Sequence, residues 1–110
     1  MSRRDAERLD DIAAAVQAIH THMGRGPLSD GLVFDAVRVR LIEIGEAVKA
    51  LDPDLLVNEP DIPWSDIAGM RDHLAHRYFD TAHSMVRVTV ETDLPPLLDA
   101  VQRLRKRKAD

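Results

Sequence analysis

The chain contains no cysteine. This absence excludes disulfide bonds, thiolate zinc sites and cysteine nucleophiles, and it leaves the redox compartment open. No stretch approaches the roughly 18 uninterrupted apolar residues of a membrane-spanning helix, so we expect no membrane association. The amino terminus has neither an apolar signal core nor a small-residue cleavage site, and we therefore expect a cytoplasmic protein. Repeats and low-complexity segments are also missing.

The 110 residues, 45% of them hydrophobic, suit one globular domain covering residues 1–110. The formal net charge is −4, yet basic side chains gather in a tail at residues 103–110, whose net charge is about +4. Such a tail is often only a solvated helix end, but it can also contact a nucleic-acid backbone. An acidic chain is not typical of a strong, non-specific nucleic-acid binder. Both interpretations of the tail stay open.

Two amphipathic helices are predicted from apolar residues that recur at spacings of three and four. The first covers 4–23 and ends at the glycines and proline of 24–27. Ser29 or Asp30 can cap the second, which ends near Pro53 and is followed by a short helical turn at Leu55–Leu56. The apolar seam of the second helix comprises Phe34, Val37, Leu41, Ile44, Val48 and Leu51.

A third helix is predicted to open at Pro63–Trp64 and to be separated from a fourth by Asp80–Thr81. The alternation of Val86–Val90 resembles a strand, and Pro95–Pro96 oppose a straight helix. A lone strand would have no partner, so we expect a helix that kinks or restarts at Pro95. The predicted fold is an all-α, antiparallel up-and-down bundle of four to five helices. Its fourth helix would bury Val86, Val90, Leu97, Val101 and Leu104.

Residues 71–78 concentrate the polar groups of chemical interest in one helical segment. At about 100° per residue, Arg71 and Tyr78 share a face, whereas His76 is displaced from Arg71 by about 140°. Either the Arg71 side chain curls round the helix, or a second copy completes the site across a two-fold axis. This geometry points to a dimer. The segment holds Arg71, Asp72, His73, His76, Arg77 and Tyr78.

These residue types suit cleavage of RNA without a metal. A histidine exchanges protons near neutral pH, and a guanidinium can hold a phosphate at two oxygens. Asp72 precedes His76 by four residues and can orient its imidazole. On spacing alone, however, surface ion pairs of Arg71 and Asp72 and half-exposed histidines are the favoured interpretation.

Residues 63–79 (PWSDIAGMRDHLAHRYF) closely resemble the signature of HepT-like proteins in the HEPN superfamily. The core of that signature is Arg, four residues, His, one residue, Tyr, and Arg71, His76 and Tyr78 match it. Asp72 stands where many members carry Asn. The resemblance extends to residues 42–48 and to Leu94–Pro95, and thus spans nearly the whole chain.

The resemblance implies a HEPN-type bundle that forms a homodimer and cuts RNA as a metal-independent endoribonuclease with no cofactor. It further implies the toxin of a type II or type VII-like toxin–antitoxin pair, neutralised by a minimal nucleotidyltransferase that transfers AMP to Tyr78. Arg71 would bind phosphate, His76 would transfer protons, and Asp72 would support them. His73 and Arg77 are candidate RNA contacts.

Three alternatives remain beside this reading. The first is a non-catalytic module that binds a nucleotide or a partner through the same motif. The second is a metal protein, although the histidine spacing fits no standard ligand motif. The third is a purely structural helical dimer. The metal hypothesis would use Asp72, His73, His76 and His83, with His20 and His22 as further candidates.

Overall fold

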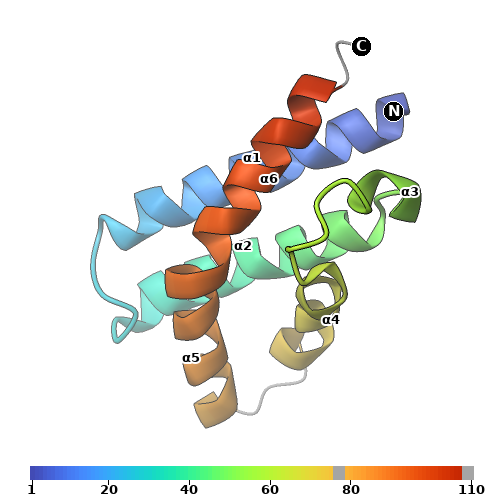
Figure 1. Cartoon of the computed structure of the whole chain (residues 1–110). Coiled ribbons are helices and arrows are strands. Elements are labelled where there is room, and N and C mark those ends of the chain that lie inside the picture. The colour runs from blue at the N-terminus through green and yellow to red at the C-terminus, as the bar shows by residue number, and fades with distance from the viewer. Residues whose placement is uncertain (76–78, 108–110) are drawn as a thin grey trace.

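Helices make up every regular element that the computed structural model describes (Figure 1). Residues 1–75 and 79–107 are described, the side chains of 79–82 excepted. The predicted all-α fold is confirmed. The elements are α1 (Arg3–Met23), α2 (Gly31–Lys49), α3 (Pro53–Leu56), α4 (Trp64–Ala75), α5 (Phe79–Val88), the π-helix η1 (Thr89–Asp93) and α6 (Leu94–Arg107).

The ends of α1 and α2 follow the predicted breaks closely. The Ser2 hydroxyl caps α1 by accepting a hydrogen bond from the backbone N–H of Asp5 at 3.0 Å. Gly24 closes α1, since its N–H donates to the carbonyl of His20 at 3.1 Å. Of the two candidate caps of α2, Asp30 is the one used, and its carboxylate accepts from the N–H of Leu32 at 2.9 Å.

The core lies where the predicted seams meet. Helix α2 packs along α1 on one side and against α4 on another, and α6 lies across α1. Every residue of the predicted α2 seam is buried, and the fourth-helix positions are buried as well, except Val90, which is partly exposed. Fully buried side chains include Leu9, Ile12, Val16, Ile19, Val37, Leu41, Ile44, Leu74, Val86, Val101 and Leu104.

The predicted helix break at Asp80–Thr81 is wrong. Helix α4 ends at Ala75 and α5 begins at Phe79, so this dipeptide lies inside α5. Aspartate and threonine favour the first turn of a helix as well as a loop, because they can satisfy its free N–H groups. Of the motif, the described part of α4 contains residues 71–75.

The strand-like stretch from Val86 is helical, and it continues into the wider turns of η1. There the N–H of Leu94 donates to the carbonyl of Thr89, five residues back. Pro95 and Pro96 have no N–H to donate to the carbonyls four residues before them. Those two carbonyls therefore lack α-helical partners, and the chain forms a wider turn there. We predicted a helix that kinks or restarts at Pro95, and the helix is indeed irregular there, with η1 leading directly into α6 at Leu94.

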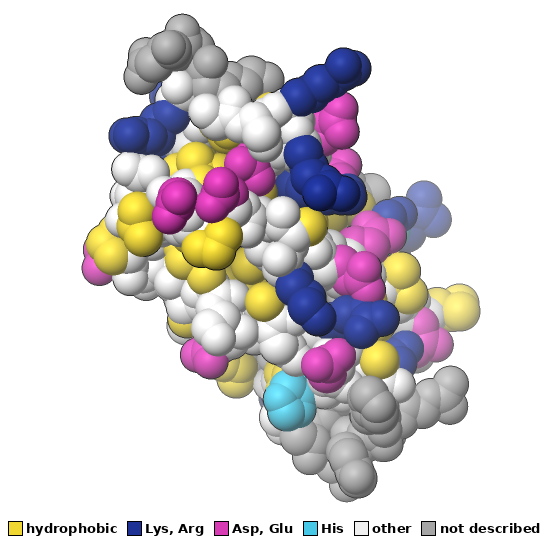
Figure 2. All heavy atoms as spheres, turned by 90° about the vertical axis from the view of Figure 1, so that its right-hand side faces the viewer, with side chains coloured by type: hydrophobic (Ala, Val, Ile, Leu, Met, Phe, Trp, Pro, Cys, Tyr) yellow, Lys and Arg dark blue, Asp and Glu magenta, His cyan; other side chains and the backbone are white. Residues whose placement is uncertain are grey.

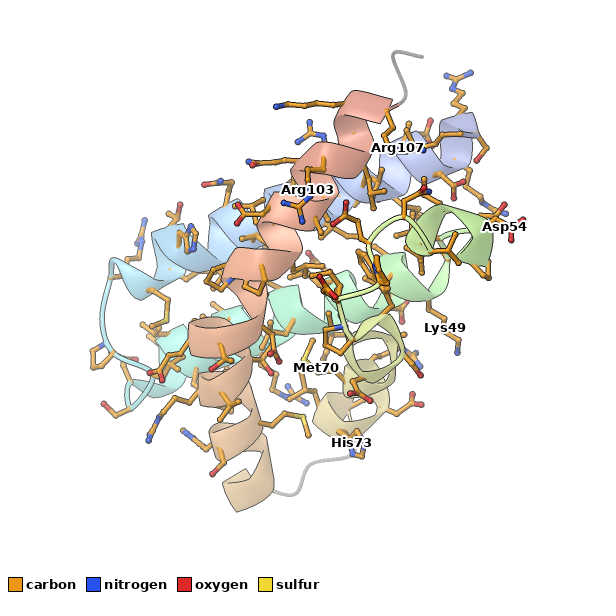
Figure 3. The ribbon with its side chains drawn as sticks, viewed as in Figure 1. Lys49, Asp54, Met70, His73, Arg103 and Arg107 are labelled. Carbon is orange, nitrogen blue, oxygen red and sulfur yellow. The ribbon has the colours of Figure 1, made fainter. Side chains whose placement is uncertain are left out.

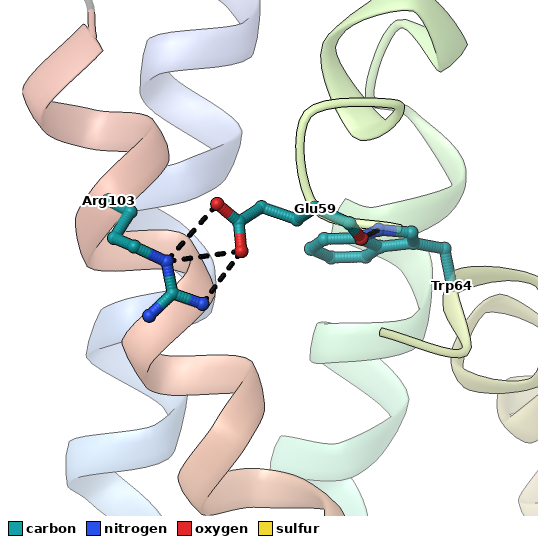
Figure 4. A network of polar contacts seen from close by, with 3 residues as sticks. All are labelled: Glu59, Trp64 and Arg103. Atoms are coloured by element: carbon teal, nitrogen blue, oxygen red, sulfur yellow. Dashed lines mark hydrogen bonds and ion pairs between the residues drawn. The ribbon is translucent and has the colours of Figure 1, made fainter. Parts of the chain in front are cut away.

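A polar network fastens α6 to the loop before α4 (Figure 4). The Arg103 guanidinium donates to both carboxylate oxygens of Glu59, the shortest contact being 2.7 Å. The indole N–H of Trp64 donates to the backbone carbonyl of Glu59 at 2.9 Å. The hydrogen bonds from Arg103 hold the pKa of the Glu59 carboxyl below its usual range.

The charged surface is mixed in sign. On the face shown in Figure 2, lysine and arginine side chains alternate with aspartates and glutamates. Arg103 and Arg105 of the basic tail bind Glu59 and Asp10, which makes these two arginines part of the scaffold. Within the described ranges, no helix is both long enough and apolar enough to cross a membrane.

Candidate functional site

The predicted motif begins in the last two turns of α4. Arg71, Asp72 and His73 lie there, and all three reach solvent. His76, Arg77 and Tyr78, which complete the motif, lie outside the described residues. The site can therefore be described at Arg71 and at the two helices on either side of residues 76–78, which are α4 and α5.

Two carboxylates bind the Arg71 guanidinium. Glu46 of α2 pairs with its Nε, and Asp72 pairs with its Nη1 at 3.3 Å. The Arg71 side chain is nevertheless 44% exposed, so an incoming anion can reach it. The Arg71–Asp72 pair matches the surface ion pair expected on spacing alone, whereas the contact with Glu46 joins two helices. The result is a solvent-accessible guanidinium held in place from two sides.

Gly45 allows α4 to lie close to α2 at this point. A Cβ atom added at Gly45 would stand 3.1 Å from the carbonyl oxygen of Ile67 and 3.4 Å from the Cβ of Arg71. Any larger residue would push α4 away, because backbone atoms cannot turn aside as a flexible side chain can. The missing side chain of Gly45 thus sets the position of Arg71 relative to Glu46.

Arg38 of α2 holds the end of α4. Its Nε and Nη2 atoms donate to the backbone carbonyl of Leu74 at 3.0 and 2.7 Å. Carbonyls in the last turn of a helix have no partner within the helix, and a cation there also meets the negative end of the dipole. Arg38 consequently fixes the chain two residues before His76.

The other flank of the motif is also fastened to α2. The rings of Phe34 and His83 stack with centroids 3.9 Å apart and planes 11° apart. Phe34 precedes Arg38 by four residues, so both lie on one face of α2. This face thus fixes α5 after the motif and α4 before it.

His73 lies apart from the cluster formed by Arg71, Glu46 and Asp72, the Arg71 cluster. Positions two apart on a helix diverge by about 200°, and His73 lines an open cleft on another side of α4. In the described part of the chain, no three histidine, aspartate or glutamate side chains gather as a metal-binding group. The ligands suggested by the metal hypothesis are spread over separate elements, with His20 and His22 on α1 and His83 on α5.

Sequence reasoning assigned no role in the site to Arg38, Gly45 or Glu46, although the last two lie in the segment 42–48 that carries part of the family resemblance. One signal was present, because Arg38 and Gly45 are seven residues apart and therefore share a helix face. A glycine in the middle of an amphipathic helix also suggests close packing. Neither pattern names the partner helix, which only the structure supplies.

A family model described as "Ribonuclease HepT-like" matches residues 7–104. A protein of Thermococcus cleftensis named "Probable ribonuclease HepT" is 34% identical over 110 residues, which cover 96% of this chain and all of the relative. A candidate RNase of Caldanaerobacter subterraneus subsp. tengcongensis is 37% identical over 64% of this chain and 63% of its own. A candidate RNase of Methanocaldococcus jannaschii is 38% identical over 62% of this chain and 57% of its own. No solved structure matches the chain significantly.

Proposed function

Because the chain belongs to the HepT-like ribonuclease family, we propose that it is a metal-independent endoribonuclease and the toxin of a toxin–antitoxin pair. One observation supports the proposal most strongly. The guanidinium of the motif arginine, Arg71, is solvent-accessible and bound by carboxylates, and carboxylate oxygens occupy the positions that phosphate oxygens would take. RNA bound here would displace Glu46, Asp72 or both.

In the proposed reaction, the imidazole of His76 accepts the proton of a ribose 2′-hydroxyl, and the 2′-oxygen forms a bond to phosphorus. The bond from phosphorus to the 5′-oxygen breaks, and that oxygen takes up a proton from an acid in the site. Arg71 stabilises the negative charge that builds up on the phosphoryl oxygens. The products are a 2′,3′-cyclic phosphate and a free 5′-hydroxyl. No redox cofactor is needed.

The site is proposed to be shared between two copies of the chain. On a helix, a separation of five residues turns His76 about 140° away from Arg71. A homodimer would let Arg71 of one copy act with His76 of the other. The basic end of α6 is not part of such a site within one chain, because Arg103 and Arg107 lie at the opposite end of the molecule from His73 (Figure 3).

Regulation is proposed to act on Tyr78, which follows His76 by two residues. A partner nucleotidyltransferase would transfer AMP from ATP to the tyrosine hydroxyl and release pyrophosphate. The added phosphate would be an anion within the motif and would compete with RNA for Arg71. Asp72, His73 and Arg77 would serve as support and RNA contacts.

The test is RNA cleavage in a metal chelator, begun with protein whose intact mass excludes a modification. The parent should cut RNA, whereas Arg71→Ala and His76→Ala should each lose activity while circular dichroism stays helical. His20→Ala, which changes an exposed histidine on α1, is the matched control and should cut as the parent does. If both motif variants retain activity, the proposal is wrong. If the parent cuts no RNA, the non-catalytic binding module is supported instead.

A further inference from the structure

An open cleft of about 410 Å³ lies between α4 and the α5–η1 segment. It arises because α4 packs closely on α2, while no comparable contact joins α4 to α5 among the described residues. The wider turns of η1 form part of its wall. Its volume falls within the range of small-molecule sites, about 300–1,000 Å³. Arg71, Glu46 and Asp72 do not line this cleft, so the proposed reaction gives it no role.

The walls of the cleft are suited to a flat ring. Met70 of α4 and Met85 of α5 both line it, together with Ile67 and Val88. Thioether groups are polarizable and pack favourably against aromatic rings. Met70 lies on α4 one turn before His73, which is near the end of the helix (Figure 3).

Two carboxylates and two hydroxyls line the cleft, and all four can accept hydrogen bonds. Asp66 and Asp93 contribute carboxylates from opposite sides, and Ser65 and Thr89 contribute hydroxyls. Lysine and arginine are absent from the described lining, so a phosphate finds no lysine or arginine to pair with there. Carboxylates pair well with amino groups, which adenine, cytosine and guanine carry and uracil lacks.

The cleft also adjoins the proposed catalytic end of α4. His73 lines it and precedes His76 by three residues in the sequence. If a phosphate of an RNA strand binds at this end of α4, the base of an adjacent nucleotide would lie near the cleft. We propose that the cleft binds a base of the RNA substrate and prefers bases that carry an exocyclic amino group. This inference takes the identity of the polymer from the proposed function.

Gly69 allows the cleft to be filled without disturbing the fold. It lines the cleft, and a Cβ added there would meet nothing within 4 Å. Leucine is also a better helix former than glycine, so Gly69→Leu should fold. Gly31 on α2 has equally open surroundings away from the cleft, which makes Gly31→Leu the matched control.

Binding is measured first, without any cleavage. Protein labelled at the methionine methyl groups gives signals from Met1, Met23, Met70 and Met85, of which only the last two line the cleft. Adenosine should shift the signals of Met70 and Met85 and leave the other two in place. Uridine should shift them less at the same concentration, and Gly69→Leu should abolish the effect.

Cleavage is then compared on oligoadenylate and oligouridylate. Gly69→Leu should lower kcat/KM on oligoadenylate by about tenfold, the loss expected when one base no longer stacks. It should change the rate on oligouridylate less, and Gly31→Leu should change neither.

The two proposals fail separately. If the parent cuts RNA but adenosine moves neither Met70 nor Met85, or Gly69→Leu keeps the parental rates, the cleft assignment is overturned and the ribonuclease stands. If adenosine shifts both methionines while no RNA is cut, the ribonuclease is overturned and the cleft remains a base-binding site.

Discussion

Glu46 of α2 pairs with Arg71 of α4 beside the point where Gly45 brings the two helices together. The carboxylate and the guanidinium are both about half exposed, so the pair stabilises the fold only slightly. The pair matters for binding, because a phosphate that approaches the Nε of Arg71 would compete with Glu46. The first prediction concerns this competition.

Glu46→Gln should strengthen RNA binding, since the glutamine amide competes with phosphate less well than a carboxylate does. An exposed ion pair is worth up to about 1 kcal/mol, which corresponds to a gain of up to about fivefold. Fluorescence anisotropy with labelled RNA, on a His76→Ala background that prevents cleavage, measures it. Glu43→Gln, which removes a carboxylate paired with Arg40 on the same helix, is the control and should have a smaller effect. Weaker binding by Glu46→Gln would show that Glu46 instead supports RNA binding.

Gly45→Ala should destabilise the protein, although alanine is the better helix former. The new methyl group would stand 3.1 Å from the Ile67 carbonyl, and displacing α4 should cost about 1–3 kcal/mol. Gly69→Ala is the matched control, because it has open space and should gain about 0.8–1.0 kcal/mol. Urea titration followed by circular dichroism measures both. Equal stability of the two variants would contradict the close approach at Gly45.

Arg38→Ala should impair cleavage more than Arg38→Lys, because lysine keeps a cation near the Leu74 carbonyl but loses the two-point hydrogen bond. The loss in stability from alanine should be about 1.5–3 kcal/mol, as for a hydrogen bond to a charged group. Amide hydrogen exchange in the last turn of α4 should speed up in both variants. Unchanged exchange there would mean that Arg38 does not hold the end of the helix.

The Glu59–Arg103 pair should make stability depend on pH. Arg103 holds the pKa of Glu59 in the folded protein below the ordinary value of 4.5. The stabilisation is therefore complete above pH 4.5 and is lost as the pH falls through the lowered, folded-state pKa. The Glu59→Gln variant should have a lower Tm than the parent at pH 7. In strong acid the Tm values of the two proteins should be nearly equal. Trp64 fluorescence reports unfolding, and a Tm difference that does not change with pH would contradict the assignment.

Much of this fold follows from the sequence, because apolar residues at helical spacing identify the buried faces of α1, α2 and α6. The helix irregularity before Pro95 was also predictable, since proline has no N–H to donate. The start of α5 was not, because Asp80 and Thr81 suit both a loop and a first helical turn.

The site was predictable only in part. Motif residues such as Arg71 could be recognised from the resemblance to the family signature, whereas the roles of Arg38 and Glu46 could not. Their roles depend on how α4 is rotated against α2, and that rotation is set by packing around Gly45. The cleft likewise results from where α5 and η1 lie, which no local pattern in the sequence encodes.

The central claim is that Arg71 and His76 cut RNA together in a site shared between two copies of the chain. The most direct measurement mixes Arg71→Ala and His76→Ala subunits, carrying different tags so that the heterodimer can be purified. Each variant alone should be inactive, and the heterodimer should recover up to about half of the parental activity, because one of its two sites is intact. Parental activity in either variant alone, or no recovery in the heterodimer, would contradict the account.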